Sequence, residues 1–203
     1  SYFFFFFELY YKFGPLLAKE IIKNGKMDAL NTALFGYVKN GLNTLPTSEQ
    51  IYEPDKFFID ERYEEFSVES IDVDGYTLVD EGSIGALDLV YLMQDKIGQK
   101  NAVNAAIGIG GGYWKDYVDA SENLLMTLKL TGDDQVELQE IHDAFILWAD
   151  AQPRFNNKET LVGGSIYLGD TNFWISLDKS FIRIVLSQDI DLLNTISNKL
   201  NDL

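Results

Sequence analysis

Residues 124–150 read LLMTLKLTGDDQVELQEIHDAFILWAD, and this stretch decides the fold class. Its first seven positions are mostly apolar, which predicts a buried strand over residues 124–130. Acidic residues follow at Asp133 and Asp134, where they favour the start of a helix. Apolar residues then recur on one helical face as far as Trp148, and Pro153 lies beyond the end. A strand followed directly by an amphipathic helix is therefore expected.

Downstream of this helix, short apolar runs alternate with turn residues. Strands are predicted at residues 165–168, 173–177 and 181–186, and Gly169-Asp170 and Asp178-Lys179 supply the turns between them. A final helix is predicted over residues 189–200. This half of the chain is typical of an antiparallel sheet.

The N-terminal half is mainly helical in pattern. Two helices are predicted, one from Gly14-Pro15 to Asn24-Gly25 and one that begins near Met27 and is closed by Asn40-Gly41. In the segment PTSEQIYEPDKF, a capping hydroxyl precedes acidic and amide residues, which predicts a short helical turn that Pro54 ends. Further helices are expected at residues 83–97 and 99–107.

Two other elements complete the expected fold. Alternating apolar residues around Asp74-Gly75 predict a hairpin near residues 66–79, and a strand is expected at 113–119. The fold class is α+β: N-terminal helices, then an antiparallel sheet with helices packed on one face. A mainly helical lobe over residues 1–110 and a sheet lobe with two helices over residues 111–203 are expected, and the two could form one compact domain.

The composition limits the classes of function that the protein can have. The 203 residues are 46% apolar, enough for a real core, and 16 basic against 32 acidic residues give a net charge of −16. This charge disfavours binding to nucleic acid or to an anionic membrane. The absence of cysteine excludes disulfides and thiolate sites.

The N-terminus carries an aromatic run. It consists of Phe3, Phe4, Phe5, Phe6 and Phe7. The chain begins at Ser1-Tyr2 in a way that resembles a cut end, and Glu8 and Lys12 interrupt the run too early for a signal peptide or a membrane span. The run is either one face of a buried amphipathic helix or a surface for assembly with other protein chains or a second copy.

No catalytic, cofactor-binding or firm metal-binding residue is predicted. His142 is the sole histidine, has no HExxH partner and is expected to be half-buried and hydrogen-bonded. The GIGGG run at Gly108–Gly112 lacks the features of a nucleotide-binding loop and is expected to form a tight turn into a strand. Weak cation candidates are Glu61, Glu64 and Glu65, although their spacing matches no EF-hand. The three tryptophans could line a groove, but core positions are the more usual place for them.

Several motifs, in this order, resemble one family of proteins. They are YKFGPLLAKEIIKNG, LPTSEQIYEPDKF, DEGSIGALDLVYLM, GIGGGYWKDY and the closing FIRIVLSQDIDLLNTISNKL. The chain resembles the C-terminal part of exported, metallopeptidase-like proteins of actinobacteria and haloarchaea. The residues that match the family pattern are Tyr11, Gly14, Pro15, Pro46, Thr47, Ser48, Glu49, Gln50, Ile51, Pro54, Lys56 and, loosely, Gly110, Gly111, Gly112 and Tyr113.

The resemblance implies an extracellular or cell-surface location and structural roles for the matching residues. Gly14 and Pro15 would start a helix, Ser48, Glu49 and Gln50 would cap one, and Gly110 to Gly112 would form a turn. The family's HExxH lies upstream and does not occur in this chain, and its glycine-turn tryptophan is displaced to Trp114. No catalytic residue therefore carries over.

Three functions stay open. The first is a non-catalytic C-terminal region of a metallopeptidase-like protein that serves as scaffold, substrate holder or interaction surface. The second is a cell-surface or filament subunit that docks through its aromatic N-terminal segment. The third is a hydrolase that uses carboxylates or a bound cation.

Overall fold

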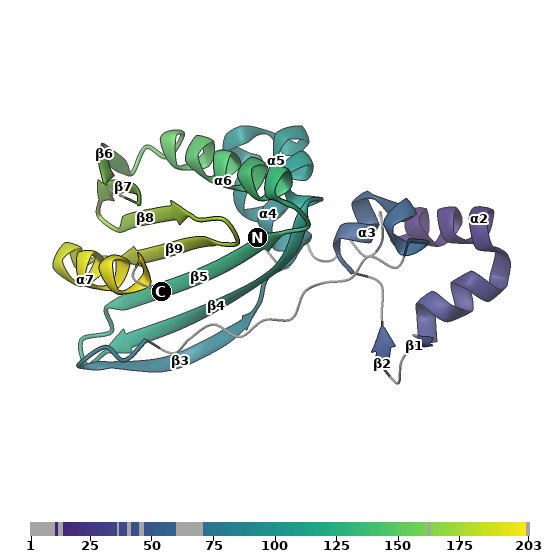
Figure 1. The fold of residues 1–203 in the computed structure, drawn as a ribbon, viewed down its shortest axis with the longest axis horizontal. Coiled ribbons are helices and arrows are strands. Elements are labelled where there is room, and N and C mark those ends of the chain that lie inside the picture. The colour runs from purple at the N-terminus through teal and green to yellow at the C-terminus, as the bar shows by residue number, and fades with distance from the viewer. Residues whose placement is uncertain are drawn as a thin grey trace.

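The computed structural model describes residue 11 and residues 14–35, 37–39, 42–44, 47–59, 71–161 and 163–201. It confirms the α+β class: an N-terminal helical part precedes an antiparallel sheet that carries helices. Figure 1 shows the sheet and its helices as one body, from which α2 and α3 extend to one side.

The described strands of the main sheet number seven and pair antiparallel in the order β3-β4-β5-β9-β8-β7-β6. Their bounds are β3 Tyr76–Ser83, β4 Ile109–Asp119, β5 Leu124–Gly132, β6 Phe155–Leu161, β7 Gly164–Gly169, β8 Asn172–Leu177 and β9 Ile182–Ser187. Neighbours in sequence form hairpins except where helices intervene, and β9 returns to pair with β5. The long strands β4 and β5 therefore lie between the edge strand β3 and the C-terminal hairpins.

Helices cover both faces of this sheet. One face carries α4 Ala86–Ile97, α5 Gln99–Ala106 and α6 Gln135–Asp150, and the other carries α7 Ile190–Asn201. Side chains alternate along each strand, so Leu128 and Phe173 join the core under α4 to α6, whereas Leu125 and Trp174 join the core under α7. Helices were predicted on one face of the sheet, and the structure adds α7 on the other face.

The N-terminal part consists of α2 Gly14–Phe35, the short strand pair β1 Tyr37–Lys39 and β2 Leu42–Thr44, α3 Glu49–Tyr52 and the 3₁₀ turn η2 Pro54–Phe57. Two separate helices were expected at its start. The structure confirms the break: Lys26, with a φ of 59° and a ψ of −163°, separates two helical segments of α2 directly after Asn24-Gly25. The second segment ends at Phe35, before the expected end at Asn40-Gly41, because Tyr37–Lys39 form β1.

The predicted turn at Gly110, Gly111 and Gly112 is wrong, because these residues belong to β4. Glycine has low strand propensity, which made a turn the natural expectation. Packing explains the difference at Gly112, where a Cβ would lie 2.3 Å from Ile84 Cγ2 and 2.5 Å from Leu130 Cδ2. β4 can therefore pass between Ile84 and Leu130 only if residue 112 has no side chain.

The predicted hairpin near residues 66–79 falls partly outside the described residues. Residues 71–73 are not in a strand, and Gly75, with a φ of 82°, turns the chain into β3. Among the described strands, β3 pairs with β4. The lobe boundary predicted between residues 110 and 111 falls inside β4.

Candidate functional site

An apolar pocket of about 500 Å³ lies between the helical layer and the sheet. The sheet supplies its floor, and α4 and α6 supply its walls. Five aromatic side chains from four elements line it: Tyr91, Trp114, Phe145, Trp148 and Phe173. A cavity of this size and lining is typical of sites for small molecules.

Strand register builds the floor of the pocket. Asp116 on β4 is opposite Met126 on β5, Met126 is opposite Leu186 on β9, and Leu186 is opposite Phe173 on β8. Directly opposite residues in antiparallel strands face the same side of the sheet. The row therefore runs from a carboxylate through apolar side chains to an aromatic ring.

Trp148, which forms part of the α6 wall of the pocket, is held in place by a hydrogen bond and by contacts with other rings. Trp148 donates a hydrogen bond from Nε1 to the Leu92 carbonyl oxygen at 3.0 Å, which ties α6 to α4. Its ring makes edge contacts with Phe145, Phe155 and Phe173 at centroid distances of 5.7 to 6.4 Å. A side chain fixed by a hydrogen bond and three rings offers a preformed surface to a ligand.

Asp116 is the polar group that the pocket leaves unsatisfied. Its Oδ1 atom is buried and has no hydrogen-bond partner among the described residues. Burial raises the pKa of the Asp116 carboxyl, and the nearby Asp80 raises it further. An acceptor kept in this state costs stability, because a buried polar atom loses its water without gaining a partner.

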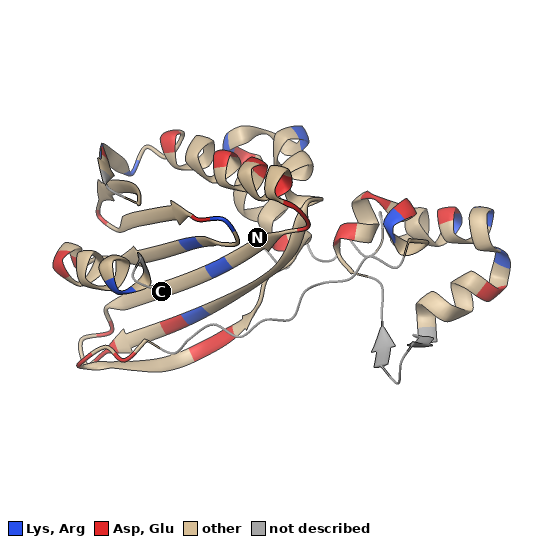
Figure 2. Cartoon of the chain, in the orientation of Figure 1, with Lys and Arg blue, Asp and Glu red and all other residues tan. Residues whose placement is uncertain are grey.

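The end of the pocket near β3 and β4 is acidic. Asp80 lies directly opposite Asp116 across the strand pair, and Figure 2 shows acidic residues on both strands. Asp88 on α4 also lines the pocket, and its Oδ2 accepts a hydrogen bond from the Gly85 backbone N–H at 3.0 Å. The Asp80 carboxylate disfavours ionisation of Asp116, and a cation would relieve this repulsion.

The opposite end of the pocket carries Arg154. Its guanidinium lies over the rings of Trp148 and Phe155, at 5.6 and 5.1 Å from their centroids. Within the described part of the chain, no carboxylate pairs with it. β4 and β8, which bear the two ends of the floor, are three strand spacings apart, or about 14 Å. The pocket is thus elongated, with an acidic end and a basic end.

A second cluster of polar residues fastens the N-terminal part to the sheet body. Lys56 Nζ lies 2.7 Å from both Glu49 Oε1 and Asp133 Oδ2, and it donates to the Ile107 carbonyl oxygen at 2.6 Å. Lys56 and Glu49 are both buried. This ion cluster, Glu49–Lys56–Asp133, joins the α3–η2 segment to the loop before α6.

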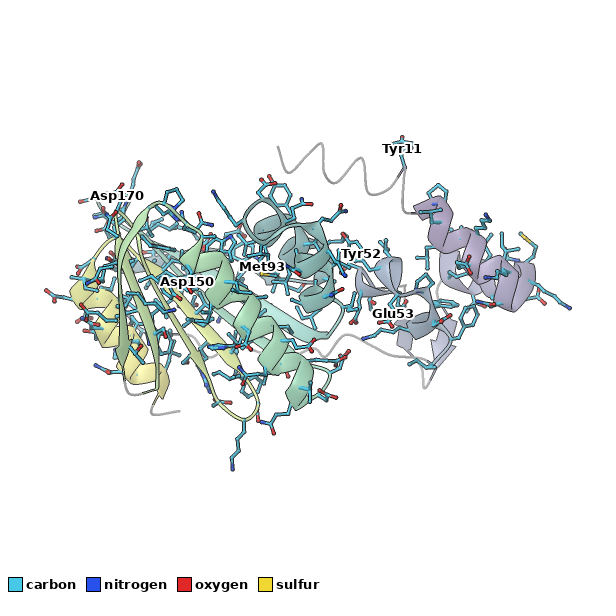
Figure 3. All side chains as sticks on the ribbon, turned by 90° about the horizontal axis from the view of Figure 1, so that it is seen from above. Tyr11, Tyr52, Glu53, Met93, Asp150 and Asp170 are labelled. Atoms are coloured by element: carbon cyan, nitrogen blue, oxygen red, sulfur yellow. The ribbon has the colours of Figure 1, made fainter. Side chains whose placement is uncertain are left out.

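Neighbouring groups support the ion cluster. Glu137 on α6 packs against Gly108, because a Cβ added to Gly108 would lie 2.6 Å from the Cβ of Glu137. Burial raises the pKa of Glu137, Asp133 raises it further, and Lys56 opposes both. Tyr52 packs against the core below α4 to α6, and burial raises its pKa to about 12. Figure 3 shows Tyr52 where α3 meets the helical layer.

The matching residues of the N-terminal motifs are placed as structural groups. Gly14 and Pro15 begin α2, as predicted. The capping bond expected from Ser48 is not formed. Instead, the Thr47 backbone N–H donates to Gln50 Oε1 at 3.2 Å, and the Gln50 backbone N–H donates to Thr47 Oγ1 at 3.5 Å. Ser48 Oγ instead lies 2.6 Å from the position of a Cβ on Gly85.

The structure shows a further role for Glu49 and the place of Pro54. Glu49 forms the buried ion pair with Lys56 instead of serving only in a cap. Pro54 ends α3, as predicted, and starts η2. The segment that contains Glu49 and Lys56 therefore attaches the N-terminal part to the sheet body.

Other predicted candidates lie outside the described residues. These are Phe3, Phe4, Phe5, Phe6 and Phe7 and the cation candidates Glu61, Glu64 and Glu65. His142 lies on α6 with 19% of its side chain exposed, and its Nδ1 is 3.4 Å from Asp143 Oδ1. Trp148 and Trp174 are buried in the core and Trp114 is only partly buried; Trp114 and Trp148 both line the pocket.

Neither a metal-binding cluster nor a membrane-spanning helix is found in the described part of the chain. In residues 14–59 and 71–201, apart from the gaps given above, no three His, Asp or Glu side chains are grouped to hold a metal ion. Over the same residues, no helix combines the length and apolarity that crossing a bilayer needs.

Asp116 and Arg154 were not singled out from the sequence. Asp116 is one of many acids in an acidic chain, and only strand pairing places it on the pocket floor. The signal that could have pointed to it is its position between Trp114 and Tyr117 within a predicted strand. Comparison with family models, curated proteins and solved structures finds no match for this chain.

Proposed function

We propose that this chain is a ligand-holding module that binds a small molecule with an apolar body between the sheet and helices α4 and α6. The observation that carries the proposal is the pocket of about 500 Å³ with five aromatic side chains in its lining. An exposed apolar cavity is costly in water, and its occupation by an apolar ligand removes that cost.

The proposal develops the predicted role of a non-catalytic substrate holder or interaction surface. Its support is the rigid aromatic wall around Trp148 and the unsatisfied acceptor of Asp116. A preformed wall lowers the entropy that a ligand must lose on binding. The proposed activity is binding and retention.

An exported, metallopeptidase-like origin is a separate part of the proposal and rests on the order of the sequence motifs alone. Reading the coding sequence upstream of Ser1 tests it. An upstream signal sequence with HExxH would support it, and an upstream segment without metal ligands would count against it.

Binding of an uncharged fluorophore, N-phenyl-1-naphthylamine, tests the pocket. We expect saturable one-to-one binding with enhanced emission. Met126→Trp should abolish it, because Met126 lies in the middle of the pocket floor and a larger ring would fill the space. The matched control is Leu124→Trp on the same strand and face, where the side chain is 45% exposed and lies outside the pocket lining. Binding that Met126→Trp leaves intact would refute the proposal.

A further inference from the structure

The acidic end of the pocket indicates which ligands it selects. We infer that the pocket takes an organic cation, an ammonium group on an apolar body, with the ammonium at Asp116 and the body along the aromatic walls. This inference rests on the proposed binding function and adds to it the chemistry of the ligand.

The first argument is the buried acceptor. Asp116 lines the pocket, and its Oδ1 atom is buried without a hydrogen-bond partner in the described residues. An ammonium would donate a hydrogen bond to it and neutralise its charge at once. Charge-assisted bonds of this kind are about twice as strong as neutral ones.

The second argument is the aromatic lining next to the carboxylate. Trp114 is two residues from Asp116 on β4, so both side chains face the same side of the sheet. Aromatic faces attract cations, and tryptophan attracts them most strongly. The pocket already shows this preference at its other end, where Arg154 lies over Trp148 and Phe155.

The third argument is electrostatic. The charged and titratable groups that face Asp116 are Asp80 on β3, Asp88 and Tyr91 on α4, and, at the far end of the pocket, Arg154. Only Arg154 is positive, so the acidic end carries an excess of negative charge. The net charge of −16 raises the local concentration of cations in the same direction.

A series of probes with one apolar body and different head groups tests the inference. We would titrate the full chain with 3-phenylpropylammonium, 3-phenylpropanol and 3-phenylpropanoate by calorimetry at pH 7. The ammonium should bind about tenfold more tightly than the alcohol, since desolvated cation–π contacts and ion pairs reach this magnitude. The carboxylate should bind most weakly.

Asp116→Asn should remove most of the ammonium's advantage over the alcohol. The matched control is Asp170→Asn, in the turn between β7 and β8, where Figure 3 shows Asp170 at the far end of the molecule from α2. This control should retain the full preference for ammonium.

A measurement on the unaltered chain keeps the test independent of the variants. The ratio of ammonium to alcohol affinity should rise with pH as Asp116 ionises, and the rise should occur above the ordinary carboxyl pKa of 3.8, because burial and Asp80 raise the pKa of Asp116. Equal binding of ammonium and alcohol at pH 7 would overturn the organic-cation inference and leave the apolar pocket standing. Failure of every probe, including the uncharged fluorophore, would overturn the pocket function as well.

Discussion

Lys56 Nζ lies 2.7 Å from Oδ2 of Asp133, although 77 positions separate the two residues in the chain. Glu49, which is buried beside Lys56, also forms an ion pair with it. A single cation thus bridges one carboxylate of the N-terminal part and one of the sheet body. Because its partners belong to different parts of the fold, this lysine governs whether the two stay together.

Lys56→Met is expected to destabilise the chain by about 3–5 kcal/mol, because removal of one partner from a buried ion pair leaves the other charge uncompensated. The midpoint of urea unfolding measures the loss, and limited proteolysis should show earlier cleavage between residues 47 and 59. The control is Lys23→Met, whose partner Glu20 lies on an exposed helical surface. An effect of Lys56→Met as small as that of the control would contradict the role of the ion cluster.

Gly112→Ala is expected to cost about 1–3 kcal/mol, the usual range for overpacking a core. The new Cβ would lie 2.3 Å from Ile84 Cγ2 and 2.5 Å from Leu130 Cδ2, so the segment before α4 or β5 would have to shift. Thermal unfolding measures the change. Gly14→Ala is the comparison, since no atom lies within 4 Å of its added Cβ. Equal melting temperatures for the two variants would show that β4 tolerates the methyl group.

Asp116→Asn should raise the melting temperature at pH 7. The pKa of Asp116 in the folded chain lies above its ordinary value of 3.8, so the folded state holds the proton more tightly than the unfolded state. The stability that this group contributes is therefore present at low pH and is lost as pH rises through the folded pKa. The asparagine does not ionise and avoids that loss.

The difference in melting temperature between the Asp116→Asn variant and the unaltered chain should shrink as the pH falls through the raised pKa of Asp116, because the carboxyl takes up a proton there. Differential scanning calorimetry between pH 4 and pH 8 follows it. A difference that is constant over this range would mean that ionisation of Asp116 carries no cost in the pocket.

Asp134→Ala should destabilise α6 by about 0.5–2 kcal/mol, the range for loss of an N-cap. The Asp134 carboxylate accepts hydrogen bonds from the backbone N–H groups of Val136 and Glu137 at 2.7 and 3.0 Å. Amide hydrogen exchange at these two positions should become faster. Asp143→Ala, in the middle of the same helix, should leave their exchange unchanged.

Local pattern was enough to predict most of the sheet body. The helix after Asp133 and Asp134 begins at Gln135 with Asp134 as its cap, and the predicted strands at residues 165–168, 173–177 and 181–186 lie within one or two residues of β7, β8 and β9. In each case, apolar periodicity and turn residues point to the same element, and tertiary packing reinforces both.

Long-range contacts explain what the sequence did not reveal. Strand β4 requires a glycine at position 112 because Ile84 and Leu130, both distant in sequence, leave no room for a side chain. The partnership of Lys56 with Asp133 and the place of Asp116 opposite Met126 likewise depend on register between distant segments. A candidate site assembled from several strands and helices cannot be read from spacing along the chain.

The order of the strands limits how the chain can be shortened for experiments. β4 begins at Ile109 and is bounded by the edge strand β3 on one side and by β5 on the other. An expression fragment that began at residue 111 would lose β3, α4 and α5, and with them one wall of the pocket. A fragment that began at Tyr76 would keep the sheet but lose Tyr52 and Lys56. The smallest fragment that retains every contact of the sheet body with the α3–η2 segment therefore starts before Thr47.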